Sequence, residues 1–93
     1  MNDRVGPILQ AGELGRAVAL AIVELNPGAE VLDRGAYYRV LVGRRCTLTR
    51  DAVERISGQR FELPQDLERV MPAFAGRLAI SAGAVYWTHE VAS

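Results

Sequence analysis

The alternation of apolar and polar positions is clearest between Asp33 and Val42, where it predicts a turn followed by a strand. Gly35 supplies the positive φ that a tight turn requires. The strand presents alternate side chains on two faces, namely Ala36, Tyr38, Val40 and Val42 on one and Tyr37, Arg39 and Leu41 on the other. Its opening Gly-Ala-Tyr-Tyr, at 35–38, is echoed by Gly-Ala-Val-Tyr at 83–86, a pattern expected of two similar halves.

The remaining apolar pattern predicts further strands and three helices. We expect strands at residues 5–9, 30–32, 45–48, 77–80 and 85–91, and helices at residues 11–25, 50–57 and 64–71. Pro7 would confine the first strand to a sheet edge or a strand end. Gly43-Arg44 has the form of a two-residue hairpin turn, which would pair the strands on either side of it.

The order of these elements is β-α-β-β twice, with the Gly-Ala-x-Tyr sequence at the same place in each half. This order predicts an α+β fold, in which two β-α-β-β units share one core and helices pack over mostly antiparallel sheets. Since no linker rich in proline or serine separates the halves, we expect residues 1–93 to form a single domain.

The first predicted helix is apolar on more than one side. Its expected core stripe consists of Leu14, Ala17, Val18, Ala21, Ile22 and Leu25. Ala19, Leu20 and Val23 fall outside this stripe, so the outer side is too apolar for a fully solvated helix. These three residues form either a second layer of the same core or a surface for a partner.

Composition and charge exclude several classes of function. Basic and acidic residues balance to a formal net charge of +0, which disfavours nucleic-acid binding. Cys46 and His89 are the only residues of their types, so an internal disulfide, a structural zinc or a multi-histidine metal site is excluded. No apolar run approaches the ~20 residues of a membrane span. Because no signal peptide is visible, we expect a cytoplasmic protein. Because no cofactor motif is present either, we expect the protein to hold no cofactor.

The sequence offers little catalytic equipment. Ser57 and Ser81 lack a nucleophile motif, Cys46 is expected to be a buried inert thiol, and His89 a half-exposed strand residue. The glycines match neither a phosphate-binding loop nor a dinucleotide fingerprint. These residues therefore favour a binding or regulatory role.

An ordered set of short segments nevertheless resembles a known family. The set consists of Val5-Gly6-Pro7-Ile8 with Ala11-Gly12, Asn26-Pro27-Gly28, Asp33-Arg34 with Ala36-Tyr37 and Arg39, Leu48-Thr49-Arg50, Gly58-Gln59-Arg60-Phe61 and Phe74-Ala75-Gly76. In this order they resemble the MmoB/DmpM family, the small effector proteins of soluble di-iron monooxygenases. The match is closest to the toluene-monooxygenase type.

The resemblance implies a protein that carries no cofactor and catalyses nothing alone. It implies binding, as a monomer, to the large subunit of a di-iron hydroxylase, where the effector tunes oxygen activation, substrate access and coupling. Methane-oxidising members carry a long N-terminal tail, whereas four residues precede Val5 here, so an aromatic- or alkene-oxidising system is favoured. The alternative is a free-standing small-ligand-binding or dimerisation domain of similar β-α-β-β architecture.

The resemblance also suggests which residues contact the hydroxylase. The candidates are Val5, Gly6, Pro7, Ile8, Asn26, Pro27, Tyr37, Arg39, Met71, Pro72, Ala73 and Phe74. Each segment has a purely structural alternative: residues 5–8 as an edge strand, the 37–39 strand face as sheet packing, and the apolar 71–74 loop as core. Asp33 and Arg34 are expected to cap their turn rather than to contact a partner. Within the loop, we expect Met71 to be the adaptable surface contact and Phe74 either an anchor or part of the core.

Overall fold

The computed structural model describes residues 3–89, so Glu90 and Val91, the end of the last predicted strand, lie outside it. The strands and helices follow one another as β1 (Arg4–Gln10), α1 (Glu13–Leu25), β2 (Glu30–Asp33), β3 (Tyr37–Gly43), β4 (Arg45–Thr49), α2 (Arg50–Ser57), α3 (Gln65–Val70), β5 (Ala73–Ala75), β6 (Arg77–Ser81) and β7 (Ala84–Thr88).

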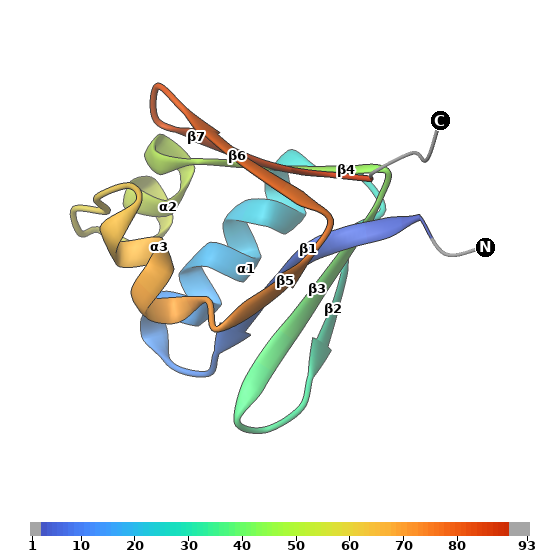
Figure 1. Ribbon diagram of the computed structural model, residues 1–93. Helices are drawn as coiled ribbons and strands as arrows, with labels where there is room; N and C mark the ends of the chain where they lie inside the picture. Colours follow the sequence, from blue (N-terminus) through green and yellow to red (C-terminus); the bar gives the residue numbers. More distant parts are fainter. Residues whose placement is uncertain (1–2, 90–93) are drawn as a thin grey trace.

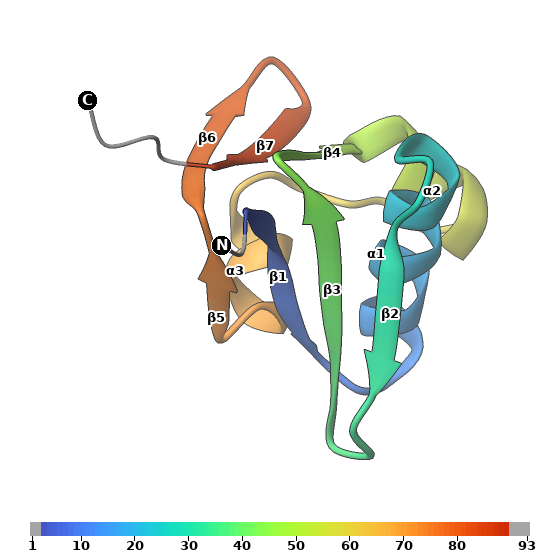
Figure 2. The ribbon, with the colours of Figure 1, turned by 90° about the vertical axis from the view of Figure 1, so that its right-hand side faces the viewer.

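The strands form two antiparallel sheets. One has four strands in the order β2-β3-β1-β5, and the other has three in the order β4-β7-β6. Helix α1 lies in the angle between the sheets, and α2 and α3 lie beside it (Figures 1 and 2). Among residues 3–89, no helix covers the opposite face of either sheet, so each sheet presents one outward face.

The two predicted β-α-β-β units are present and confirm the α+β fold. In the first unit the hairpin β2-β3 returns so that β3 pairs with β1, and in the second the hairpin β6-β7 returns so that β7 pairs with β4. The Gly-Ala-x-Tyr echo therefore marks the entry to the central strand of each three-stranded unit. The three-residue strand β5 was not predicted, and it extends the first sheet beyond β1.

The predicted hairpin at Gly43-Arg44 is wrong. Strand β3 already has neighbours on both edges, β1 and β2, so β4 cannot pair with it and joins β7 instead. The chain passes from one sheet to the other at Arg44, whose φ of 69° lies in the left-handed region. The Arg44 N–H and C=O bond with Asp3 and His89, which holds this crossing in place.

The predicted edge position of Pro7 is also wrong, because β1 lies between β3 and β5. The paired positions of β1 and β3 skip Gly6 and Pro7, so the missing N–H of Pro7 falls where the ladder is already interrupted. Gly6 has a φ of 144°, and a Cβ atom built there would lie 2.3 Å from the carbonyl oxygen of Val40. Only glycine permits this close approach of the two backbones.

The core joins both sheets and all three helices in one cluster, with Phe61 and Trp87 among its largest fully buried side chains. Ala19 is buried in it as part of a second core layer, whereas Leu20 and Val23 are exposed and do not belong to the core. Leu25, predicted as core, is 37% exposed because the helix ends there.

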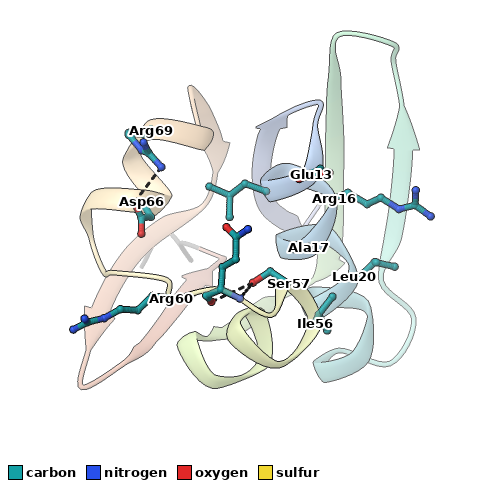
Figure 3. Close-up of a pocket in the computed structure, with 11 residues that line it drawn as sticks. Glu13, Arg16, Ala17, Leu20, Ile56, Ser57, Arg60, Asp66 and Arg69 are labelled. Carbon is teal, nitrogen blue, oxygen red and sulfur yellow. Dashed lines mark hydrogen bonds and ion pairs between the residues drawn. The ribbon is translucent and has the colours of Figure 1, made fainter.

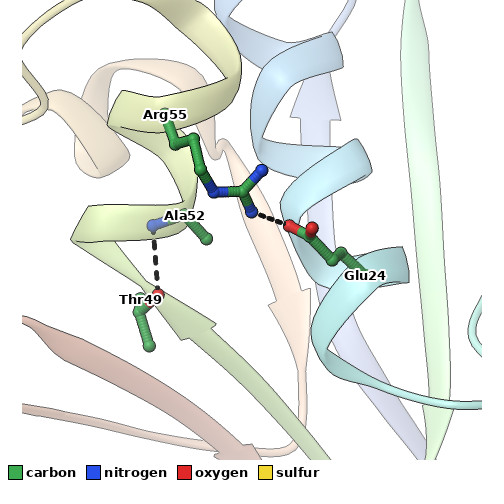
Figure 4. A network of polar contacts seen from close by, with 4 residues as sticks. All are labelled: Glu24, Thr49, Ala52 and Arg55. Atoms are coloured by element: carbon green, nitrogen blue, oxygen red, sulfur yellow. Dashed lines mark hydrogen bonds and ion pairs between the residues drawn. The ribbon is translucent and has the colours of Figure 1, made fainter.

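Helix α2 begins and ends as predicted. The Thr49 hydroxyl accepts a hydrogen bond from the Ala52 N–H at 3.2 Å, and Gly58 closes the helix with a left-handed φ of 71°. Arg55 forms an ion pair with Glu24 of α1 rather than with its own helix (Figure 4). Both side chains of this pair are exposed, so it adds little to the stability of the helix packing.

Candidate functional site

Four residues form a straight row across the outward face of the four-stranded sheet. The strand register places Leu32 opposite Arg39, Arg39 opposite Ile8, and Ile8 opposite Ala73. Side chains at these facing positions project from the same side of a sheet. Three predicted contact residues, Ile8, Arg39 and Ala73, are thus brought together from three different strands.

Tyr37 lies beside this row, opposite Gln10, and its side chain is 40% exposed. Leu41 follows on the other side of Arg39 and is only 8% exposed although it faces outward. The ion pair between Arg4 of β1 and Glu30 of β2 spans β3 here, because Glu30 lies opposite Leu41. We call the outward surface of Ile8, Leu32, Tyr37, Arg39 and Ala73 the front face.

The front face is apolar with one prominent charge. Ile8 and Leu32 are half-buried, whereas Arg39 and Ala73 are exposed. Within the described residues Arg39 forms no ion pair, so its guanidinium remains available for a carboxylate. A surface of this kind suits docking against a protein better than chemistry on a small substrate.

Other predicted contact residues lie on the opposite side of the same strands. Val5, Gly6 and Pro7 are buried, with Val5 and Pro7 turned towards the core. Pro7 is paired with Phe74 of the edge strand β5. These side chains support the sheet from within, so any contact they make with a partner would be indirect.

The segment 71–74 is not the apolar loop that the sequence predicted. Met71 ends α3 and is buried at 9% exposure, while Phe74 lies in β5 and is 44% exposed. Pro72 and Ala73 are exposed between them. Met71 is therefore core and not the expected surface contact, because pairing of residues 73–75 with β1 pulls it inward. Phe74 stays exposed at the rim of the sheet, which contradicts its core alternative, and its role as an anchor stays a prediction.

The remaining predicted contact residues lie where α1 ends. Asn26 is buried and its amide hydrogen-bonds the backbones of Ile22 and Thr47, which is a structural role. Pro27 is exposed in the following turn. At the β2–β3 turn, the Asp33 carboxylate accepts a hydrogen bond from the Gly35 N–H at 2.9 Å, as the predicted cap requires. Arg34 contributes its backbone there, by donating to the carbonyl oxygen of Tyr37.

A hollow of about 460 Å³ lies among the helices, away from the front face. Its apolar part comes from Leu14, Ala17, Leu20 and Ile56, and Arg69 is paired with Asp66 at its border. Figure 3 shows Arg16 and Arg60 pointing away from the hollow on opposite sides. Ser57, its one hydroxyl residue, is engaged with the backbone of Gln59. The lining offers no nucleophile paired with a base.

Titratable chemistry is sparse throughout the described part of the chain. Burial raises the pKa of Cys46 to about 12, so the thiol stays protonated and unreactive at neutral pH. Between residues 3 and 89, no three histidine, cysteine, aspartate or glutamate side chains gather as metal ligands would. In the same range, no helix has the length and apolar character needed to cross a membrane.

Sequence reasoning missed Leu32 as part of the front face, and it missed β5 as a strand although it named Ala73 as a contact residue. The position of Leu32 could have been inferred from the sequence. Once the β2–β3 turn pairs Asp33 with Tyr38, the preceding residue Leu32 must pair with Arg39 and face the same side. Strand β5 could not be inferred in this way, since three residues are too few to show a period.

Comparisons with known proteins agree with one another. The model of the MmoB/DmpM family matches residues 3–88. The effector subunit of an alkene monooxygenase system from Xanthobacter autotrophicus is 39% identical over 91 residues, covering 96% of this chain and 89% of the relative. A chain in a solved phenol hydroxylase–regulatory protein complex superimposes with a TM-score of 0.82 at 22% identity, over 94% of this chain and 99% of that one. Regulatory protein B of soluble methane monooxygenase gives a TM-score of 0.74 at 18% identity, covering 98% of this chain and 68% of that protein.

Proposed function

Because the chain belongs to the MmoB/DmpM family, we propose that it is the effector subunit of a multicomponent monooxygenase and binds that system's di-iron hydroxylase. The protein is a regulatory component and catalyses nothing by itself. The alkene monooxygenase effector, 39% identical, supports an alkene- or aromatic-oxidising system. The toluene type that the sequence suggested stays a prediction, as do the cytoplasmic location, the absence of a cofactor and the monomeric state.

The proposed docking surface is the front face together with Phe74, which the register places on the other side of the edge strand β5. The observation that carries this proposal is the row of Leu32, Arg39, Ile8 and Ala73, which crosses four strands and is covered by no helix of the described chain. Phe74 supplies an exposed aromatic side chain at the edge of the same sheet. Aromatic and arginine side chains are the residues that most often dominate binding energy at protein interfaces.

The proposed action is a shift between hydroxylase conformations. A rigid sheet presents these side chains with little conformational entropy left to lose on binding. The effector can then favour one hydroxylase state only by the difference between its affinities for the two states. Oxygen activation, substrate access and coupling to electron supply would follow from that shift.

The alternative function is binding of a small ligand, and the hollow among the three helices is the observation that favours it. Its lining combines apolar and charged side chains, so it would suit a small molecule that has an apolar part and a polar part. This alternative is independent of the front face, so substitutions in the two places separate the functions.

The experiment is reconstitution with the hydroxylase of the same system, measuring affinity and product formed per electron donor consumed. Arg39→Ala and Tyr37→Ala should weaken binding by about 1–3 kcal/mol each while leaving the fold intact. Arg34→Ala is the matched control, because Arg34 is an exposed arginine whose structural contribution is its backbone. Equal affinity for all three variants would contradict docking through the front face.

A further inference from the structure

The outward face of the three-stranded sheet differs in character from the front face. The register aligns Arg45, Thr88 and Arg77 in one row and Thr47, Tyr86 and Ala79 in the next. A third row consists of Thr49, Ala84 and Ser81. We call these three rows the arginine face, because its only charges are the two arginines and none of its positions is acidic.

These positions face outward, since the residues between them fill the core. Cys46, Val85 and Trp87 are buried, whereas Arg45 and Arg77 are exposed on the alternate positions. Figure 1 shows the sheet β4-β7-β6 with the helices on one side and nothing on the other. The arginine face is therefore open to a partner.

The two arginines flank Thr88 and neither is neutralised. The guanidinium of Arg45 lies 4.6 Å from the centroid of the Tyr86 ring, which holds it against the sheet. In the described residues, neither Arg45 nor Arg77 takes part in an ion pair. Two neighbouring guanidinium groups without carboxylates, one of them held against a tyrosine ring, are complementary to an acidic surface.

Positive and negative charges are distributed unevenly between the strands and the helices, although the formal net charge of the chain is +0. The strands carry more arginines than acidic residues, with Arg4, Arg39, Arg45 and Arg77 against Glu30 and Asp33. The helices carry the opposite excess, with Glu13, Glu24, Asp51, Glu54, Asp66 and Glu68 against Arg16, Arg50, Arg55 and Arg69. A neutral protein with separated charges is oriented by the field of a charged partner before contact.

We infer that the arginine face meets an acidic surface of the hydroxylase and steers association, an inference that rests on the proposed function. The front face would supply the apolar contact, while Arg45 and Arg77 set the orientation of approach. Balanced charge and the absence of lysine-rich segments favour a protein carboxylate surface over nucleic acid as the occupant.

The test is stopped-flow association of the full chain with its hydroxylase at low and high salt. Arg45→Glu and Arg77→Glu should each slow association about threefold at low salt, and the double variant about tenfold, with little effect at high salt. Arg77→Lys should retain the rate within about twofold, because it keeps the charge. Arg50→Glu is the matched control on a helix and should change the rate less than about twofold.

The outcomes are distinguishable. If Arg45→Glu and Arg77→Glu associate no more slowly than Arg50→Glu, the inference is overturned while the proposed function stands. If the unmodified chain does not bind the hydroxylase at all, both fail. Binding of a single-stranded oligonucleotide as tight as binding of the hydroxylase would also overturn the inference, and melting temperatures of all variants exclude unfolding as the cause.

Discussion

The side-chain amide of Asn26 forms hydrogen bonds with both backbone groups of Thr47. Nδ2 donates to the Thr47 carbonyl oxygen at 2.7 Å, and Oδ1 accepts from the Thr47 N–H at 2.8 Å. Nδ2 also donates to the carbonyl oxygen of Ile22, near the end of α1. Since β4 is an edge strand, the amide takes the place of a neighbouring strand there. Asn26 thus joins the end of α1, the helix of the first β-α-β-β unit, to the first strand of the second unit.

We expect Asn26→Ala to destabilise the fold by about 2–4 kcal/mol, because it leaves two partly buried backbone groups of Thr47 without their hydrogen-bond partner. Urea unfolding followed by the fluorescence of Trp87, the single and fully buried tryptophan, measures this. Thr47→Val is the control, since Asn26 contacts only the Thr47 backbone. An equal loss of stability in the two variants would mean that the hydrogen bonds of the Asn26 amide do not stabilise the fold.

Gly6→Ala should destabilise the protein more than Gly12→Ala. The two glycines have similar φ values, 144° and 140°, so the backbone strain of adding a Cβ is comparable. At Gly6 the new atom would lie 2.3 Å from the Val40 carbonyl oxygen, whereas at Gly12 nothing lies within 4 Å. We expect a further cost of about 1–3 kcal/mol from this overlap. Equal melting temperatures would show that the sheet can move apart at Gly6.

Met71→Ser should lower the stability of the fold, whereas Phe74→Ser should lower the affinity for the hydroxylase. Met71 is buried, so its loss should lower stability by about 2–4 kcal/mol while folded molecules retain normal hydroxylase activation. Phe74 is 44% exposed, so its loss should leave the melting temperature within a few degrees and weaken binding. Melting curves and reconstituted turnover per folded molecule, measured on the same samples, separate the two. Normal turnover with Phe74→Ser would remove Phe74 from the proposed docking surface.

Cys46 should make stability fall at alkaline pH. Its pKa is raised by burial from 9.0 to about 12, so the folded protein keeps a proton that the unfolded chain releases. The stability contributed by the protonated thiol is complete below about pH 9 and is lost as pH rises towards 12, by about 2 kcal/mol between pH 8 and pH 10.5. Comparing urea unfolding of the unmodified chain with that of Cys46→Ala isolates the contribution of this thiol from all other effects of pH. Parallel pH profiles for the two proteins would contradict it.

The sequence by itself determined the helices, the strands other than β5, and the direction of side chains along β3. Alternation in residues 36–42 assigned the inward and outward faces of β3, and Thr49 and Gly58 marked both ends of α2 through local hydrogen bonding and backbone conformation. The outward positions Tyr37 and Arg39 were identified in this way before their neighbours were known, whereas Ile8 was named only through the family resemblance. Such signals are local, because they depend on residues a few positions apart.

Only the tertiary structure decided which strands become neighbours. A backbone ladder uses the same N–H and C=O groups whatever the sequence, so alternation fixes the face of a strand but not its partner. For this reason β4 crosses to the second sheet at Arg44, and Pro7 lies inside the first sheet instead of at its edge. The short pairing of β5 with β1 likewise decides that Met71 is core and Phe74 surface, because it depends on contacts between segments more than sixty positions apart.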